Sequence, residues 1–151
     1  MNIRFAIASA LILSLPALAT TAVAQSGLPV AELTAGFHRI EAEVAASPDD
    51  RATGLMHREK LPMQRGMVFV FAGEGAHCMW MRNTLLPLSV AFLDARGVIV
   101  NIDDMKPQTL DNHCASKPAR YALEMNRGWV AARGIKAGDA IGGIDRLPKG
   151  Y

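Results

Sequence analysis

The chain has 151 residues, with 16 Lys and Arg against 14 Asp and Glu and a formal net charge of +2. Basic and acidic residues are nearly equal in number, so the chain lacks the basic excess that is typical of nucleic-acid-binding proteins. We therefore expect no nucleic-acid partner. The length suits one domain with a sizeable core and is too short for two domains of typical size.

The first 24 residues have the features of a cleaved signal peptide. Arg4 supplies the positive start, and the apolar run from Phe5 to Leu15 is too short to span a bilayer. Ala22-Val23-Ala24 then places small residues where a signal peptidase cleaves. We therefore predict cleavage just before Gln25, a periplasmic or secreted protein, and no membrane-spanning segment in the mature chain. An uncleaved membrane anchor is the alternative.

The N-terminal part of the mature chain predicts a strand followed by a short helix. Residues 25–36 are expected to be a flexible start, ahead of a single domain at 37–145 and a loosely held tail at 146–151. Side chains alternate from Phe37 to Ala45, with an apolar face formed by Ile40, Ala42 and Val44 and a wet face that includes Glu43. Ser47 as N-cap, followed by Pro48, predicts a helix of about two turns, to residue 55.

The later elements are short and closely spaced. Strands are predicted at 67–71, 77–81, 88–94, 98–103, 121–125 and 140–144, with a polar loop at 105–118 and a second short helix at 129–133. Glycine-containing turns at 73–75 and 94–97 separate neighbouring strands, as in hairpins. We therefore predict a single mainly β (α+β) domain, a compact antiparallel barrel or sandwich with two short helices.

Two cysteines, Cys78 and Cys114, are candidates for a disulfide. An even cysteine count in an exported chain favours that bond. It would close a loop of about 36 residues and add about 3–4 kcal/mol in the chain-entropy model. A free buried cysteine and a redox or metal pair are the alternatives, although no C-x-x-C motif supports a thioredoxin-type site.

Three groups of residues carry a resemblance to a known family. They are the run Trp80-Met81-Arg82-Asn83-Thr84 with Pro87; Arg51, Gly54, Leu55, Met56 and Arg58; and Pro118, Leu123, Glu124, Gly128, Gly134, Ile135, Gly138 and Asp139. From about Val44 to Ile141 the chain resembles the domain of unknown function 192 family, a group of small bacterial and archaeal proteins. The resemblance implies a compact β-rich fold and supplies no assigned active site.

The polar run Arg82-Asn83-Thr84 follows a predicted strand and has two interpretations. Its donors and hydroxyl could bind an anion or a polar ligand. The same residue types satisfy local backbone groups in turns, and we favour the turn. Trp80, just before the run, is expected in the core, with the floor of a pocket as the alternative.

Glu124 is the most informative carboxylate. It lies between Leu123 and Met125, which are expected to point inward, so its side chain faces the opposite side of the strand. If that side is buried, an arginine is needed to pair the charge. The candidates are Arg51, Arg58 and Arg82, and a structural ion pair is favoured over a catalytic acid.

We carry three functional hypotheses forward. The first is an exported, non-enzymatic binding or accessory module, without cofactor and expected to be monomeric, whose partner is an unknown small molecule or protein. Its candidate surface comprises Arg51, Arg58, Trp80, Arg82, Asn83, Thr84 and Glu124. The second is a small hydrolase-like enzyme that uses Glu124 with an arginine and a histidine. The third is a copper or other metal-binding protein that uses Met79, Met81 and His77, for which core packing is the favoured alternative.

Overall fold

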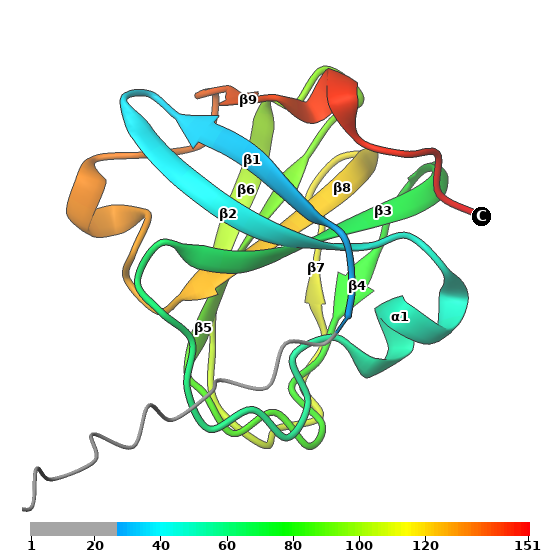
Figure 1. Cartoon of the computed structure of the whole chain (residues 1–151), viewed down its shortest axis with the longest axis vertical. Coiled ribbons are helices and arrows are strands. Elements are labelled where there is room, and N and C mark those ends of the chain that lie inside the picture. The colour runs from blue at the N-terminus through cyan, green and yellow to red at the C-terminus, as the bar shows by residue number, and fades with distance from the viewer. Residues whose placement is uncertain (1–26) are drawn as a thin grey trace, which may run out of the picture.

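One curled sheet of seven strands dominates the fold (Figure 1). The structure is a computed structural model that describes residues 27–151, so the predicted signal peptide and its cleavage site lie outside the described residues. The strand order is β6-β5-β8-β3-β2-β1-β9. In chain order these strands are β1 (Val30–Ala35), β2 (His38–Ala45), β3 (Arg65–Gly75), β5 (Leu88–Leu93), β6 (Ile99–Met105), β8 (Ala119–Asn126) and β9 (Ile141–Gly142).

The remaining elements are small. Two short strands form a separate sheet, and one α-helix and two 3-10 helices complete the fold. They are β4 (Cys78–Met79), β7 (His113–Cys114), α1 (Pro48–Thr53), η1 (Ala131–Arg133) and η2 (Ile144–Arg146). The prediction of a mainly β domain is confirmed.

Strand pairing in the large sheet is antiparallel except between β2 and β3. A parallel pair needs a crossover connection, and residues 46–64, which include α1, supply it. At one end the two edges of the sheet approach each other, because Ile99 of β6 accepts a hydrogen bond from the Gly138 amide and donates its own to the Asp139 carbonyl, just before β9. The curled sheet therefore closes partly on itself.

The sheet carries a hydrophobic core on each face. Alternate side chains of β3 separate the two cores, with Val68 and Val70 in one and Met67 and Phe69 in the other. The first core includes Leu33, Ile40, Leu123 and Trp129. The second core is covered by Leu55, which follows α1, by Met79 of β4 and by Met81 just after β4. This cover is what shapes the candidate site.

Several local predictions differ from the structure. The expected flexible start contains β1, which pairs with β2 on one side and β9 on the other. The expected turn at 73–75 belongs to the end of β3. The loop at 105–118 contains β7, and the strand expected at 77–81 shortens to β4. The tail is held against the domain, since the Tyr151 carbonyl accepts a hydrogen bond of 2.7 Å from Arg51.

The start of α1 follows its prediction and gives a direct test. Ser47 is the N-cap, and its hydroxyl accepts a hydrogen bond of 3.1 Å from the Asp50 amide. We expect Ser47→Ala to lower the free energy of unfolding by about 1 kcal/mol, because that amide loses its partner. Asp49→Ala, in the same turn without a capping bond, is the control. Urea denaturation of both variants measures the difference, and equal stabilities would contradict the capping role.

Candidate functional site

Three carboxylates lie in one row across the sheet. The strand registers align Glu43 of β2 with Met67 of β3, Met67 with Glu124 of β8, Glu124 with Val90 of β5, and Val90 with Asp103 of β6. Residues opposite one another in neighbouring strands share a face, so the three acids are spaced two strands, or roughly 10 Å, apart. The face is that of the second core.

The two outer acids of the row have cationic or imidazole partners. Glu43, 3% exposed, receives two bonds from the Arg58 guanidinium, at 2.5 and 2.7 Å. This hydrogen bonding to Glu43 raises the pKa of Arg58 although burial opposes it. Asp103 lies 2.5 Å from Nδ1 of His113. The central acid is different.

Glu124 is buried without a partner for its carboxyl group. It is 3% exposed, and its neighbours across the strands, Met67 and Val90, are fully buried apolar side chains. Within residues 27–151 its side chain makes no hydrogen bond or ion pair. Burial raises its pKa from 4.5 to about 8. At neutral pH the group is therefore mostly a protonated acid, which can donate a hydrogen bond.

A narrow cleft gives access to this acid. Its walls come from α1 and the turn after it, from the sheet, and from β4 and the turn that follows. The lining residues are Arg51, Ala52, Thr53, Gly54, Leu55, Met56, Phe69, Met79, Trp80, Thr84 and Glu124. The space inside that a water molecule can enter is about 20 Å³, which is room for about one water. The cleft can therefore admit the end of a ligand and not a whole one.

The ion pair predicted for Glu124 is wrong, because none of the three candidate arginines bonds to it, and Arg58 and Arg51 have other partners. Arg58 binds Glu43. Arg51 lines the cleft, but its guanidinium donates to the backbone carbonyls of Ala46, Val70 and Tyr151. It therefore braces α1 against the end of β2, β3 and the tail.

The polar run at 82–84 is mainly a turn. Asn83 has a left-handed backbone with a φ of 55°, its carbonyl accepts from the His57 amide, and its side chain is exposed. Thr84 is 5% exposed and is the only member of the run that lines the cleft within the described chain. Arg82 extends over the ring of Trp80, 5.8 Å from the ring centre.

Trp80 lies at the surface, so its expected place in the core is wrong. It is 45% exposed and lines the cleft. The reason is the alternation along this segment, which gives the inner face to Met79 and Met81, 8% and 0% exposed. The alternative interpretation, the floor of a pocket, is nearer to what is found, since the residue is part of the cleft lining.

The three candidate metal ligands take up different roles. Met79 and Met81 pack in the second core. His77 stacks on Phe71 with ring centres 3.7 Å apart, and its Nε2 lies 2.9 Å from the Gly73 carbonyl oxygen. Residues 27–151 contain no group of three or more His, Cys, Asp or Glu side chains that could hold a metal ion.

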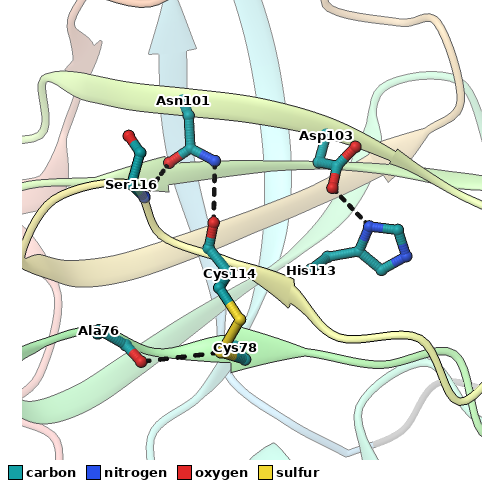
Figure 2. The surroundings of a disulfide bond; sticks show 7 residues. All are labelled: Ala76, Cys78, Asn101, Asp103, His113, Cys114 and Ser116. Carbon is teal, nitrogen blue, oxygen red and sulfur yellow. Dashed lines mark hydrogen bonds and ion pairs between the residues drawn. A yellow bond between two sulfur atoms is a disulfide. The ribbon is translucent and has the colours of Figure 1, made fainter.

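The predicted disulfide is confirmed. Cys78 and Cys114 are bonded, with their Cα atoms 4.0 Å apart, and they face each other across β4 and β7 (Figure 2). The bond holds the chain at Cys78, directly before Met79 and Trp80, which line the cleft. It therefore secures the outer wall of the site.

Sequence reasoning did not single out Glu43, and it considered Asp103 among the strand-end carboxylates but favoured a solvated position at the border of a loop. Alternation places Glu43 on the face opposite Ile40 and Ala42, which is correct, but that face was expected to be wet. The crossover carries Arg58 over it and buries the carboxylate. Only the register between strands distant in sequence reveals the row, so no local signal could have found it.

Comparisons with known proteins agree with the fold. The DUF192 family, described as "Uncharacterized ACR", matches residues 30–143. A crystal structure from Sinorhizobium meliloti 1021, of a protein provisionally described as a transcription regulator, is similar with a TM-score of 0.75 and 31% identity, covering 80% of this chain and 98% of that one. No curated protein matches.

A second crystal structure is similar to the same degree. It is of a protein of unknown function from Novosphingobium aromaticivorans DSM 12444, with a TM-score of 0.75 and 32% identity, and covers 83% of this chain and 93% of that one.

None of the helices described between residues 27 and 151 is long and apolar enough to cross a bilayer.

Proposed function

Because this chain belongs to the DUF192 family, for which the family description gives no activity, we propose a function from the cleft itself. The protein is an exported, non-enzymatic binding module. It binds the end of a small molecule or of an extended peptide. A group at that end accepts a hydrogen bond from protonated Glu124. The cross-link between Cys78 and Cys114 supports export, since disulfides persist in oxidising compartments.

The observation that carries the proposal is the carboxyl group of Glu124, which has no hydrogen-bond partner among the described residues and reaches the cleft from a side chain that is otherwise buried. Burying a polar group without a hydrogen bond costs free energy, roughly 1–3 kcal/mol by mutational measures. A ligand that supplies the missing partner recovers part of that cost on binding. Functional sites are where such perturbed carboxyl groups concentrate.

The chemistry of the lining selects the class of ligand. Leu55, Phe69 and Met79 contribute apolar side chains to a lining that also contains polar groups. Because the cleft has room for about one water, a charged end would lose most of its solvation there. A carbonyl or ether oxygen can enter and accept a hydrogen bond from protonated Glu124, while Thr84 offers a hydroxyl on the same cleft. The exposed ring of Trp80 can cover the part of the ligand that remains outside.

The enzyme hypothesis has one observation in its favour, the pKa of Glu124 near neutrality, which suits a general acid. It requires a histidine beside that acid. Among the described residues, none of the four histidines lines the cleft, and the lining Arg51 is engaged with backbone carbonyls. Binding is therefore the better supported function.

The test is a titration with a neutral acceptor, N-methylacetamide, followed by the NMR signal of the Trp80 indole. We expect millimolar binding below pH 8 that weakens about tenfold for each pH unit above it, because ionised Glu124 cannot donate. Glu124→Gln keeps a donor of the same shape and should bind without this pH dependence. Glu124→Leu should not bind.

Methylammonium chloride is the opposing probe. If it binds and N-methylacetamide does not, with affinity rising above pH 8, the cleft takes cations and the proposed ligand class is wrong. If neither probe shifts the Trp80 signal in a folded protein, the binding function itself is contradicted. The amide spectrum of each variant serves as the check of folding.

A further inference from the structure

The small sheet formed by β4 and β7 depends on a single covalent bond. It contains two residue pairs, Cys78 with Cys114 and Met79 with His113. A pair of strands this short has little stability of its own. Both cysteines are exposed, and exposed disulfides are the ones that reductants reach and that serve as labile or regulatory bonds.

The two strands are anchored in different ways apart from that bond. Figure 2 shows β7 fastened to β6 by side chains. Asn101 donates to the Cys114 carbonyl at 3.1 Å and accepts from the Ser116 amide at 2.9 Å, and Asp103 holds His113. Cleavage of the disulfide would therefore leave β7 in place.

The β4 segment is held mainly by backbone hydrogen bonds to residues 108–115, on the β7 side. The Ala115 amide donates to the His77 carbonyl at 2.9 Å, and the Met81 amide donates to the Thr109 carbonyl at 3.2 Å. The Thr84 carbonyl accepts from the Gln108 amide at 3.1 Å. The other attachments are the burial of Met79 and Met81, the stacking of His77 on Phe71, and the hydrogen bond from the His57 amide to the Asn83 carbonyl.

This loosely tied segment is also the outer wall of the cleft. Met79, Trp80 and Thr84 line it, and all follow Cys78 within six residues. The disulfide does not attach to the opposite walls, which are α1 and the sheet, since it joins β4 to β7. Movement of β4 would widen the opening above Glu124 without disturbing the seven-stranded sheet.

We propose that the Cys78–Cys114 bond is a site of thiol–disulfide exchange, and that its reduction by a dithiol loosens β4 and opens the cleft. The thiolate of the dithiol attacks one sulfur and forms a mixed disulfide, and its second thiol then displaces the protein sulfur. Two electrons and two protons pass from the dithiol to the protein. The products are free Cys78 and Cys114 thiols and the oxidised, disulfide form of the reductant.

The inference takes its functional meaning from the proposed binding function, but it can be tested with no ligand present. The folded chain is incubated with dithiothreitol, the free thiols are alkylated with iodoacetamide, and the mass of the protein is measured by mass spectrometry. We expect two alkyl groups per molecule after native treatment, with the main sheet still folded. A bond that resists millimolar dithiothreitol until denaturant is added would show that it is not an exchange site.

Hydrogen–deuterium exchange then shows where the reduced protein loosens. We expect exchange to become about tenfold faster or more in peptides covering 76–87 and 106–112, with no change in β5 and β8. The Cys78→Ser/Cys114→Ser double variant should reproduce this pattern without reductant. Unchanged exchange in 76–87, or loss of protection across the whole sheet, would overturn the gating role while leaving ligand binding by the oxidised protein untouched.

Discussion

Replacing Arg58 with Ala is expected to lower the free energy of unfolding by about 3–5 kcal/mol, the usual cost of removing one partner from a buried ion pair. The Glu43 side chain is only 4% exposed, and Arg58 holds both of its carboxylate oxygens. Without the guanidinium the carboxylate remains buried and loses the two charge-assisted hydrogen bonds that Arg58 donates. Since a domain of this size has a stability of roughly 5–15 kcal/mol, the variant approaches the limit of folding.

Urea denaturation at pH 7 measures the loss. Arg58→Lys is the matched control and should recover part of the stability, because an ammonium keeps the charge and loses the two-pronged geometry. A double variant, Glu43→Leu with Arg58→Met, should be more stable than Arg58→Ala, because it leaves no buried charge. If Arg58→Ala costs less than 1 kcal/mol, the pair has the weight of a surface salt bridge and its burial is energetically unimportant.

Replacing Glu124 with Gln is expected to stabilise the protein, and by more as the pH rises. The folded-state pKa of Glu124 is about 8, because the group is buried, against its ordinary value of 4.5 in an unfolded, solvent-exposed chain. Between these values the folded state holds a proton that the unfolded state has lost. The contribution of this group to the free energy of unfolding is therefore full below pH 4.5, decreases as the pH rises, and is lost above pH 8.

The size of the effect follows from the shift. Each pKa unit corresponds to 1.36 kcal/mol, so Glu124 destabilises the fold at pH 9 by roughly 5 kcal/mol at most, relative to pH 4. Gln does not titrate, so the variant should lose this slope. Thermal melts of both proteins from pH 5 to pH 9 measure it. Parallel curves would mean that the carboxyl group has an undetected cation or water network that holds its ordinary pKa.

The periodic strands were predictable because their signal is local. Burial of Ile40, Ala42 and Val44 on one face of β2 follows from alternation alone. The same rule placed Glu124 opposite Leu123 and Met125. What alternation cannot supply is the depth of cover on each face, which depends on where the crossover and β4 pack.

The partners of charged residues were the least predictable part of the site. Three arginines were candidates for Glu124, and none takes that role. Arg58 is 15 residues from its partner Glu43, and Arg51 reaches Tyr151, 100 residues away. Such pairings are set by the assembled sheet and not by spacing along the chain. The disulfide was predictable because two cysteines allow only one intramolecular pairing.

The position of β8 has a consequence for biosynthesis. β8 (Ala119–Asn126) lies between β3 and β5 in the sheet, although five of the other six strands precede it in the chain. A growing chain therefore holds two separate groups of strands, β1 to β3 and β5 with β6, which cannot join until residue 126 has been made. Completion of the sheet is then a late event, and an unfinished chain exposes the edges of β3 and β5 to chaperones or to aggregation.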